Sequence, residues 1–291
     1  MKGPLRPSVY RFKLGAFEVA TVFDGSIQLD GPHPIFGENQ EAADVQALLE
    51  SNLLPKERFE IGFTPTIVNT GTELVLFDAG NGAGRRPDAG SLRERLTEAG
   101  YPPESIDVVV LTHFHPDHIG GLMEDGTPAF PNARYVASST EYDFWSPQEK
   151  ASGPTERVGK LVQANVVPFA EKMSFIGNGD QVVSGITGLA ANGHTPGHMV
   201  FHLESEGKRF AITADTANHF VVSLQRPDWH VRFDMDKAAA AKARQDVFGM
   251  LAADKIPFAG YHMPFPSVGY VEPLSGGGFR YVPASYQLNL G

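Results

Sequence analysis

The chain contains no cysteine and no long hydrophobic run, and each absence excludes a class of protein. Without cysteine there is no disulfide scaffold, no thiolate metal site and no cysteine nucleophile. No apolar run approaches the roughly 20 residues that cross a bilayer, and the basic start of the chain, 1–12, lacks the apolar segment of a signal peptide. We therefore expect no membrane partner. We expect a cytoplasmic protein, or a periplasmic or secreted one if a leader has been removed.

Basic residues are also few, because 24 Lys and Arg stand against 34 Asp and Glu, for a formal net charge of −10. A surface of this sign repels the phosphates of nucleic acids, so a small-molecule partner is favoured. The 291 residues are 42% hydrophobic and 20% charged, which is typical of a globular protein. Length alone favours about two domains. No linker-like segment divides the chain, and we therefore expect a single domain over 1–291.

Hydrophobic periodicity predicts alternating strands and helices. Strands are expected as two short segments within Tyr10–Ile27, as a hairpin of Thr64–Thr70 and Glu73–Phe77, and at Ile106–Leu111, Ala133–Ala137, Met199–Leu203, Arg209–Thr213 and Phe279–Val282. Helices are expected at Glu41–Glu50, from a capping box at Ser91–Glu94 to Gly100, over part of Val158–Lys172, and at Lys237–Lys255. Strands that alternate with isolated helices indicate an α/β fold.

The segment Thr112–Gly121 (THFHPDHIGG) concentrates metal-binding side chains directly after a predicted strand. His113 and His115 are two residues apart, so in an extended loop their side chains point the same way and can bind one ion. Asp117 and His118, beyond the proline, can bind a second ion. Imidazole nitrogens and carboxylate oxygens are ligands that Zn²⁺ accepts. The alternative is a polar loop in which histidines cap a helix, and so dense a cluster disfavours it.

Three further candidates lie far along the chain. His194 is the first histidine of GHTPGH, Asp215 follows a predicted strand, and His262 follows another short apolar segment. Taken alone, such an aspartate can cap the next element. A lone histidine is more often structural. The order of the whole set, and not any single member, indicates a metal site.

With these residues the chain resembles the metallo-β-lactamase superfamily, through the HxHxDH motif and the distant histidine, aspartate and histidine. The resemblance implies a four-layer αβ/βα sandwich of two mixed sheets flanked by helices, with two metal ions at the edge between the sheets. It implies one ion on His113, His115 and His194, a second on Asp117, His118 and His262, and Asp215 as the bridge. It also implies that His194, and not His198, is the ligand, and that Asp78 supports the ligand loop from behind.

Residues other than the ligands indicate which branch of the superfamily the chain resembles. Asp215 stands where one group of true β-lactamases has a cysteine, and those enzymes are therefore disfavoured. The chain after His262 is too short for the glutathione-binding domain of glyoxalase II-like thioesterases, and no nuclease insertion or flavodoxin domain is recognised. Asn218 stands where acyl-homoserine lactone lactonases have a tyrosine. The chain also resembles the methyl parathion hydrolase group of phosphotriesterases and related lactonases, through four segments: Asp215–Phe220, Arg232–Arg244, Pro264–Pro266 after His262, and Gly278–Tyr286.

The site predicts a hydrolase in which a hydroxide bridging two divalent ions, Zn²⁺ first among them, attacks a lactone, ester or phosphotriester. Asp215 would orient the hydroxide, and Asp117 is the candidate to take a proton in the leaving step. Thioester or sulfate-ester cleavage on the same site and a non-catalytic, metal-stabilised binding protein are the alternatives. Members of the resembled group also imply a homodimer.

Aromatic residues near predicted loops favour an apolar substrate. Aromatic side chains also dominate ordinary cores, so some of these residues are expected to be structural. The candidates for the substrate wall, or for the layer behind the ligands, are Phe36, Trp145, Trp229, Phe265, Asn218 and His219.

Overall fold

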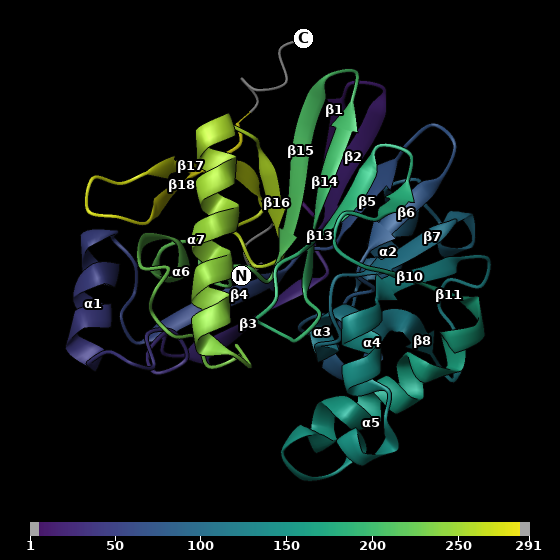
Figure 1. Ribbon diagram of the computed structural model, residues 1–291, viewed down its shortest axis with the longest axis horizontal. Helices are drawn as coiled ribbons and strands as arrows, with labels where there is room; N and C mark the ends of the chain where they lie inside the picture. The colour runs from purple at the N-terminus through teal and green to yellow at the C-terminus, as the bar shows by residue number, and fades with distance from the viewer. Residues whose placement is uncertain (1–5, 286–291) are drawn as a thin grey trace, which may run out of the picture.

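The computed structural model describes residues 6–285 and contains two seven-stranded sheets that pack face to face (Figure 1). The first sheet, in spatial order, is β1 (Val9–Leu14), β2 (Phe17–Val22), β5 (Thr66–Asn69), β6 (Leu74–Phe77), β7 (Val108–Leu111), β10 (Arg134–Ser138) and β11 (Met173–Ile176). The second is β12 (Gln181–Val183), β13 (Ile186–Ala190), β14 (Met199–Ser205), β15 (Lys208–Ala214), β16 (Phe258–Gly260), β17 (Val268–Pro273) and β18 (Phe279–Pro283).

Both sheets are mixed. β6, β7, β10 and β11 are parallel neighbours in the first sheet, and β15 and β16 are parallel in the second, whereas the other neighbours are antiparallel. All four side chains of β7 (VVVL) are buried, because both faces of this strand are covered. The inner faces of the two sheets share one core, which includes Val19, Val110, Phe201 and Phe210.

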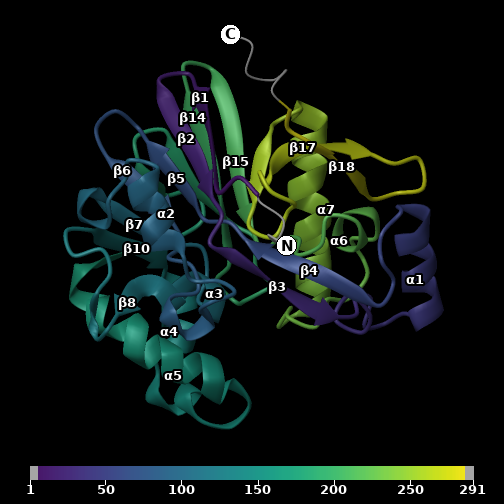
Figure 2. The same ribbon diagram turned by 180° about the vertical axis from the view of Figure 1, so that it is seen from behind.

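Helices cover the outer face of each sheet (Figure 1, Figure 2). Leu96 of α2 (Leu92–Glu98), Trp145 of α4 (Ser139–Trp145) and Val162 of α5 (Glu156–Asn165) belong to the core on the first sheet. Phe248 of α7 (Lys237–Asp254) belongs to the core on the second. This order of layers confirms the predicted four-layer sandwich. The remaining helices are α1 (Ala42–Ser51), α3 (Pro116–Ile119), α6 (Val222–Gln225), η1 (Ala83–Arg85), η2 (Pro103–Ser105), η3 (Gly120–Leu122), η4 (Gln148–Ala151), η5 (Gly153–Thr155) and η6 (Val167–Lys172).

The two strands predicted within Tyr10–Ile27 are present as β1 and β2, but a third strand begins in the same segment. β3 (Gly25–Asp30) leaves the first sheet and pairs with β4 (Arg58–Phe63), and neither is among the predicted strands. At Gly25 φ is +151°, and a Cβ would lie 2.4 Å from the backbone of Ala89. Only glycine fits this close crossing of two segments. A second two-stranded ribbon is formed by β8 (Met123–Glu124) and β9 (Thr127–Pro128).

Helix α2 forms where it is predicted, but its first turn is capped differently. Ser91 makes no side-chain capping hydrogen bond, so the predicted capping box is wrong. The carboxylate of Asp24, which is distant in sequence, accepts a hydrogen bond from Leu92 N at 2.7 Å instead. By contrast, α7 begins as its sequence suggests, since the side chain of Asp236 accepts from Ala239 N at 3.0 Å. The other predicted helices and strands are present with small shifts in their bounds.

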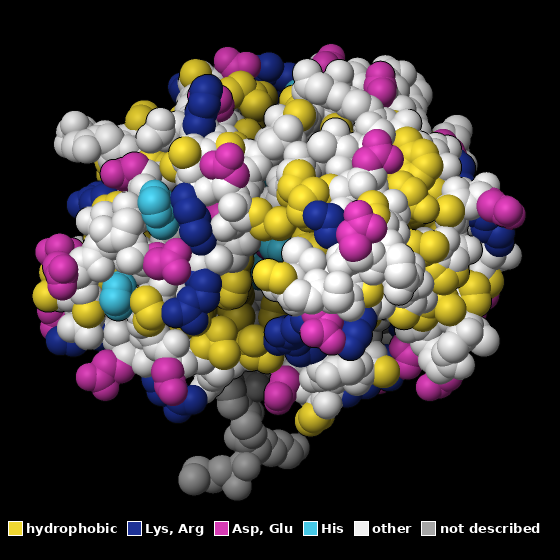
Figure 3. All heavy atoms as spheres, turned by 60° about the horizontal axis from the view of Figure 1, so that its bottom comes forward, with side chains coloured by type: hydrophobic (Ala, Val, Ile, Leu, Met, Phe, Trp, Pro, Cys, Tyr) yellow, Lys and Arg dark blue, Asp and Glu magenta, His cyan; other side chains and the backbone are white. Residues whose placement is uncertain are grey.

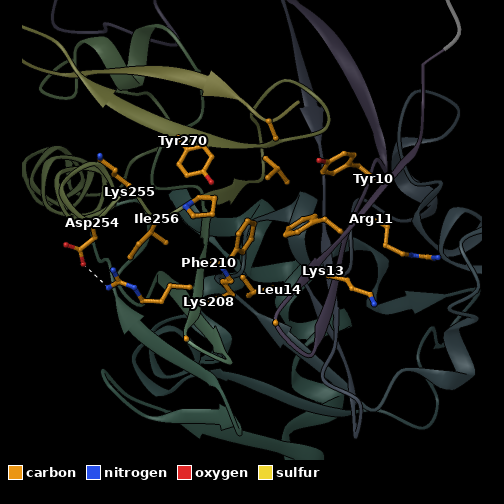
Figure 4. A pocket seen from close by; sticks show the side chains of 17 residues that line it. Tyr10, Arg11, Lys13, Leu14, Lys208, Phe210, Asp254, Lys255, Ile256 and Tyr270 are labelled. Atoms are coloured by element: carbon orange, nitrogen blue, oxygen red, sulfur yellow. Dashed lines mark hydrogen bonds and ion pairs between the residues drawn. The ribbon is translucent and has the colours of Figure 1, made fainter. Parts of the chain in front are cut away.

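A broad groove of about 840 Å³ lies between β1 and the neighbouring strands β15 to β17 (Figure 4). Tyr10, Phe210 and Tyr270 stand around it, and Arg209 forms an ion pair with Asp254 at 2.8 Å on its side. None of the predicted metal ligands lines this groove. Across residues 6–285, no helix combines the length and the apolar composition needed to cross a membrane.

Candidate metal centre

The predicted ligands lie on loops that follow four strands from both sheets. His113 and His115 follow β7, and Asp117 lies in the first turn of α3. The three candidates far along the chain follow strands of the second sheet. His194 comes after β13, Asp215 directly after β15, and His262 after β16. The two sheets therefore deliver their ligands to one edge of the sandwich.

The side chains form two groups, each of which could hold one metal ion. The first is His113, His115, His194 and Asp215, and the second is Asp117, His118, His262 and Asp215. Within each group the candidate ligand atoms all lie within 4.8 Å of one another. Asp215 belongs to both groups, and its carboxylate lies 3.3 Å from His194 Nε2, 3.2 Å from His118 Nε2 and 3.0 Å from His262 Nε2. The two groups contain the residues named in the prediction, and His194, not His198, belongs to the first of them.

The positions of the donor atoms suit metal ions better than hydrogen bonds among the donors themselves. His113 Nε2, His118 Nε2 and Asp215 Oδ1 are buried and have no hydrogen-bond partner among the described residues. Buried polar atoms are rarely left without a partner. Nitrogen and oxygen donors that converge in this way suit a divalent cation such as Zn²⁺.

The electrostatics favour positive charge beside Asp215. Burial lowers the pKa of His113 and of His115 well below the usual range, so both imidazoles are neutral. Burial also opposes charge on His118, but Asp215, Asp78 and Asp117 together raise its pKa well above the usual value. The carboxylates therefore draw positive charge to the point where the two groups meet.

A second layer of residues fixes three of the imidazoles by the nitrogen that faces away from the site. His118 Nδ1 donates to Asp78 at 2.8 Å, and His262 Nδ1 donates to the backbone oxygen of Gly62 at 2.8 Å. His194 Nδ1 donates to Asp234 at 2.9 Å, and Asp234 is in turn bound by Arg244 at 2.8 Å. Such contacts set the tautomer of a ligand and its orientation.

Asp215 is held by its neighbours. Its backbone N–H donates to His198 Nε2 at 3.1 Å, and Asn218 donates to its carboxylate at 2.9 Å. Burial lowers the pKa of His198 to about 3, so this imidazole stays a neutral acceptor. Ala214, the residue before Asp215, has φ of +44°, a left-handed conformation that is uncommon for alanine. His198 and Asn218 therefore position the aspartate that both groups share.

The sequence reasoning missed several residues that support the centre. The fully buried carboxylate of Glu141 accepts hydrogen bonds from Phe114 N, Thr195 Oγ1 and Gly197 N, and so links the two histidine loops. Tyr261 donates to the backbone oxygen of Asp117 at 2.6 Å. Only Tyr261, beside His262, had a sequence signal. Asp234 and Arg244 lie in a segment noted for its resemblance, but nothing in the sequence marks their roles.

Five of the seven candidate ligands line a cavity of about 240 Å³, far smaller than the groove beside β1: His115, Asp117, His194, Asp215 and His262. A metal bound by either group would therefore face this smaller space. Figure 3 shows that face hollowed, with apolar side chains around the hollow, histidine at its depth and basic side chains on its rims. The lining includes an apolar wall made of Ile27, Leu29, Ile61, Phe63 and Phe233.

The four aromatic candidates do not line this cavity, which corrects their expected place on the substrate wall. Phe36 and Trp229 are buried in a core with α1, and Phe265 packs against Phe23. Trp145 is buried behind the site and donates to Glu141 at 3.0 Å. Aromatic type alone does not distinguish a core from a pocket wall, because both environments favour it.

His219 also lies away from the cavity lining. It is buried among aromatic rings, with its centroid 5.2 Å from that of Phe36, and its Nδ1 accepts from the backbone N–H groups of Val221 and Val222. Its position supports the start of α6 and gives it no contact with the ligand groups.

Comparison with known proteins agrees with this geometry. The metallo-beta-lactamase superfamily model matches residues 64–257. An N-acyl homoserine lactonase of Bacillus sp is 30% identical over 149 residues, which cover 51% of this chain and 53% of that protein. One of Bacillus cereus is 25% identical over the same length and coverage. The chain thus spans about half the length of the curated relatives it matches.

Two solved structures match over nearly their whole length. AidC, a dizinc quorum-quenching lactonase in complex with a product, is 26% identical with a TM-score of 0.86, and the match covers 96% of this chain and 98% of that one. The hydrolase AbOPH of the beta lactamase superfamily is 27% identical with a TM-score of 0.87, over 97% and 99%. Since the family model covers most of the chain and the ligand groups form as the motif requires, the chain belongs to the metallo-β-lactamase superfamily.

Proposed function

We propose that this protein is a binuclear metal-dependent hydrolase of lactones and other esters with an apolar group, and that acyl homoserine lactones are the first substrates to test. The observation that carries the proposal is the pair of ligand groups that share Asp215 at the base of a cavity. The similarity to lactonases over half to nearly all of the chain supports it.

We propose two zinc ions, one on each group, because imidazole nitrogens and carboxylate oxygens are ligands that Zn²⁺ accepts. When bound, they would supply a Lewis acid for the substrate oxygen and lower the pKa of water toward neutrality. Asn218 orients Asp215, the residue that belongs to both groups and would help to hold both ions. Asp117, at 16% side-chain exposure against 3% for Asp215, is the more accessible carboxylate. We therefore assign to Asp117 the transfer of a proton to the leaving group.

The apolar wall formed by Ile27, Leu29, Ile61, Phe63 and Phe233 supports a substrate with an acyl chain or a similar apolar group. Apolar walls with a few convergent polar groups are usual for small-molecule sites. A neutral lactone ring beside such a wall would place its carbonyl toward the histidines at the base of the cavity.

The test is a substrate panel on zinc-reconstituted protein, together with metal analysis. We expect two zinc ions per chain, and a higher kcat/KM for acyl homoserine lactones than for matched thioesters, sulfate esters and phosphotriesters. Asp215→Asn should abolish turnover while the far-UV circular dichroism spectrum stays unchanged. Absence of turnover with every ester, or full activity of Asp215→Asn, would refute the proposal.

The same measurements decide the remaining predictions. A phosphotriester preference would favour the phosphotriesterase branch, and metal binding without any turnover would favour a binding protein. Light scattering tests the predicted homodimer.

A further inference from the structure

Two arginines face the cavity that contains the ligand groups. Arg85 ends η1, and Arg157 lies in the first turn of α5. Both line the ligand cavity, and both also line an adjoining space of about 250 Å³ that continues beyond Pro116. Two segments far apart in sequence thus place guanidinium groups where the two spaces meet.

Neither guanidinium has a hydrogen bond or ion pair with another residue in the range 6–285. The guanidinium of Arg85 lies over an aromatic ring, with its Cζ 5.7 Å from the centroid of Phe63. Arg86, next in the chain, differs because it binds both carboxylate oxygens of Glu124, at 2.6 and 3.1 Å. Arg85 is half-buried and Arg157 is exposed to solvent, so both guanidinium groups are available to a ligand that enters the cavity.

The nearest acid on the same helix does not neutralise them. Glu156 forms an ion pair with Lys160, and Asp117 and Asp215 belong to the metal-binding groups. A guanidinium is a planar donor that matches a carboxylate or phosphate with two parallel hydrogen bonds. The free donors therefore suit an anionic group brought by a ligand.

The other side of the cavity has the opposite character, because the wall from β3 and β4 is apolar. A ligand that fills both sides needs an apolar part near Ile61 and Phe63 and an anionic part near the arginines. Its scissile bond would lie between them, over the histidines and aspartates.

We propose that Arg85 and Arg157 form an anion subsite, so that among esters and lactones with an apolar group those carrying a second, anionic group of the carboxylate or phosphonate type are hydrolysed with a higher kcat/KM than neutral ones such as acyl homoserine lactones. This inference rests on the proposed hydrolase function and specifies its substrate class. The two arginines act as specificity-determining residues and take no part in bond cleavage.

The kinetic test compares esters that differ only at the far end of the acyl chain. The set is 4-nitrophenyl hexanoate, the 4-nitrophenyl monoester of adipic acid, and 4-nitrophenyl 5-phosphonopentanoate. We expect Arg85→Gln and Arg157→Gln each to lower kcat/KM for an anionic ester about tenfold, and to change it less than twofold for hexanoate. Arg157→Lys should recover part of the loss. The two anionic esters show whether carboxylate or phosphonate is preferred.

Lys208→Gln is the matched control, because it removes the same charge from an exposed residue of the groove beside β1. It should leave the ratio of anionic to neutral kcat/KM unchanged. Equal losses for neutral and anionic esters in the arginine variants, or an unchanged ratio, would overturn the subsite.

A binding measurement separates this inference from the proposed function. The phenylamides of adipic acid and of hexanoic acid are titrated calorimetrically into the metal-free protein. We expect the adipic acid phenylamide, which carries a free carboxylate, to bind more tightly than the hexanoic acid phenylamide. Each Arg→Gln variant should reduce this difference in affinity about tenfold. If no ester is hydrolysed but this advantage exists, the function fails and the subsite stands. If the two amides bind equally, the subsite is refuted even in an active enzyme.

Discussion

Asp234 connects a metal ligand to a buried cation. Its two oxygens accept from His194 at 2.9 Å and from Arg244 at 2.8 Å, and the arginine is fully buried. Asp234→Asn would loosen the hold on the His194 tautomer and leave a buried guanidinium without its counter-charge. We expect zinc affinity to fall about 10- to 100-fold and the free energy of unfolding to fall by about 3 kcal/mol.

Competition with a zinc indicator and urea denaturation measure these two effects of Asp234→Asn. The control is Asp254→Asn, which breaks the exposed ion pair with Arg209. It should cost less than about 1 kcal/mol and leave zinc affinity unchanged. Wild-type affinity in Asp234→Asn would contradict the role given to the second layer.

His219 should make the protein sensitive to acid. Burial lowers its pKa to about 4 in the folded protein, while the unfolded chain has the usual value near 6.5. The unfolded state therefore binds more protons below pH 6.5. The contribution of His219 to the free energy of unfolding is fully present above pH 6.5 and is lost as the pH falls toward 4. The loss from this residue alone is about 3 kcal/mol.

His219→Asn keeps an acceptor for the N–H groups of Val221 and Val222 but does not titrate. The free energy of unfolding should consequently fall less steeply between pH 6.5 and 4 in the variant than in the wild type. Urea denaturation of both proteins, with a chelator throughout, removes the effect of metal loss. Parallel pH profiles would show that His219 is not the source of the acid sensitivity.

At the scale of single residues, the sequence predicts which side chains gather into the two groups, but it does not predict the residues that hold those side chains in place. His113 to His118 lie within one short loop, so spacing alone shows their chemistry. Asp234, Glu141 and Arg244 are of types that usually lie on the surface. Their burial and partners arise only when distant segments meet, as when Glu141 reaches Thr195 at 2.8 Å.

The start of α2 depends on a residue from another element. Asp24 accepts from Leu92 N at 2.7 Å and also from the backbone and side chain of Asn81, at 2.9 and 2.8 Å. Asp24→Ala leaves these buried donors without an acceptor, so we expect a loss of about 3 kcal/mol. Ser91→Ala should cost less than about 0.5 kcal/mol, because the Ser91 side chain caps nothing. Chemical denaturation measures the free energy of unfolding of both variants. Equal losses would mean that Ser91 caps the helix as the sequence pattern predicts.

Helix α4 links the two histidine loops through Glu141. Glu141→Gln places an amide N–H₂ among four donors, from Phe114, Trp145, Thr195 and Gly197. We expect a loss of about 2 to 4 kcal/mol and weaker zinc binding, since two ligand loops lose a common anchor. Trp145→Tyr, which removes a single donor, should affect zinc binding less. Unchanged zinc affinity in Glu141→Gln would show that the loops are held without it.

Elements with strong local patterns were predictable, and those defined by crossing segments were not. α7 is rich in alanine, a strong helix former, and β7 is an unbroken apolar run, and both form where expected. β3 (GSIQLD) and β4 (RFEIGF) each alternate apolar and polar residues, but their pairing in a ribbon apart from the first sheet depends on Gly25, which allows the chain to pass close to Ala89. Such a ribbon depends on tertiary contact, which no local window contains.

The whole molecule gathers its ligands from both sheets at one edge. β7 belongs to the first sheet, whereas β13, β15 and β16 belong to the second. Bound ions would therefore add a link between sheets that already share an apolar core. The predicted single domain over 1–291 stays a prediction, but the position of the ligands explains why the fold and the site form together.

Metal removal should lower the stability of the whole molecule without unfolding it. Three hydrophobic cores exist independently of the ions. Zinc at about 100 times its dissociation constant adds about 2.7 kcal/mol per site by mass action. Two sites in a chain of this size then correspond to a shift in Tm of roughly 10 °C or more.

Scanning calorimetry with a chelator, and again after zinc is returned, measures this shift. The metal-free protein should still unfold cooperatively and keep its far-UV spectrum. His115→Gln/His262→Gln removes one ligand from each group, so its Tm should hardly respond to the chelator. An unchanged wild-type Tm would mean that the groups bind no metal. Loss of all secondary structure would mean that the two sheets cannot hold together without the ions.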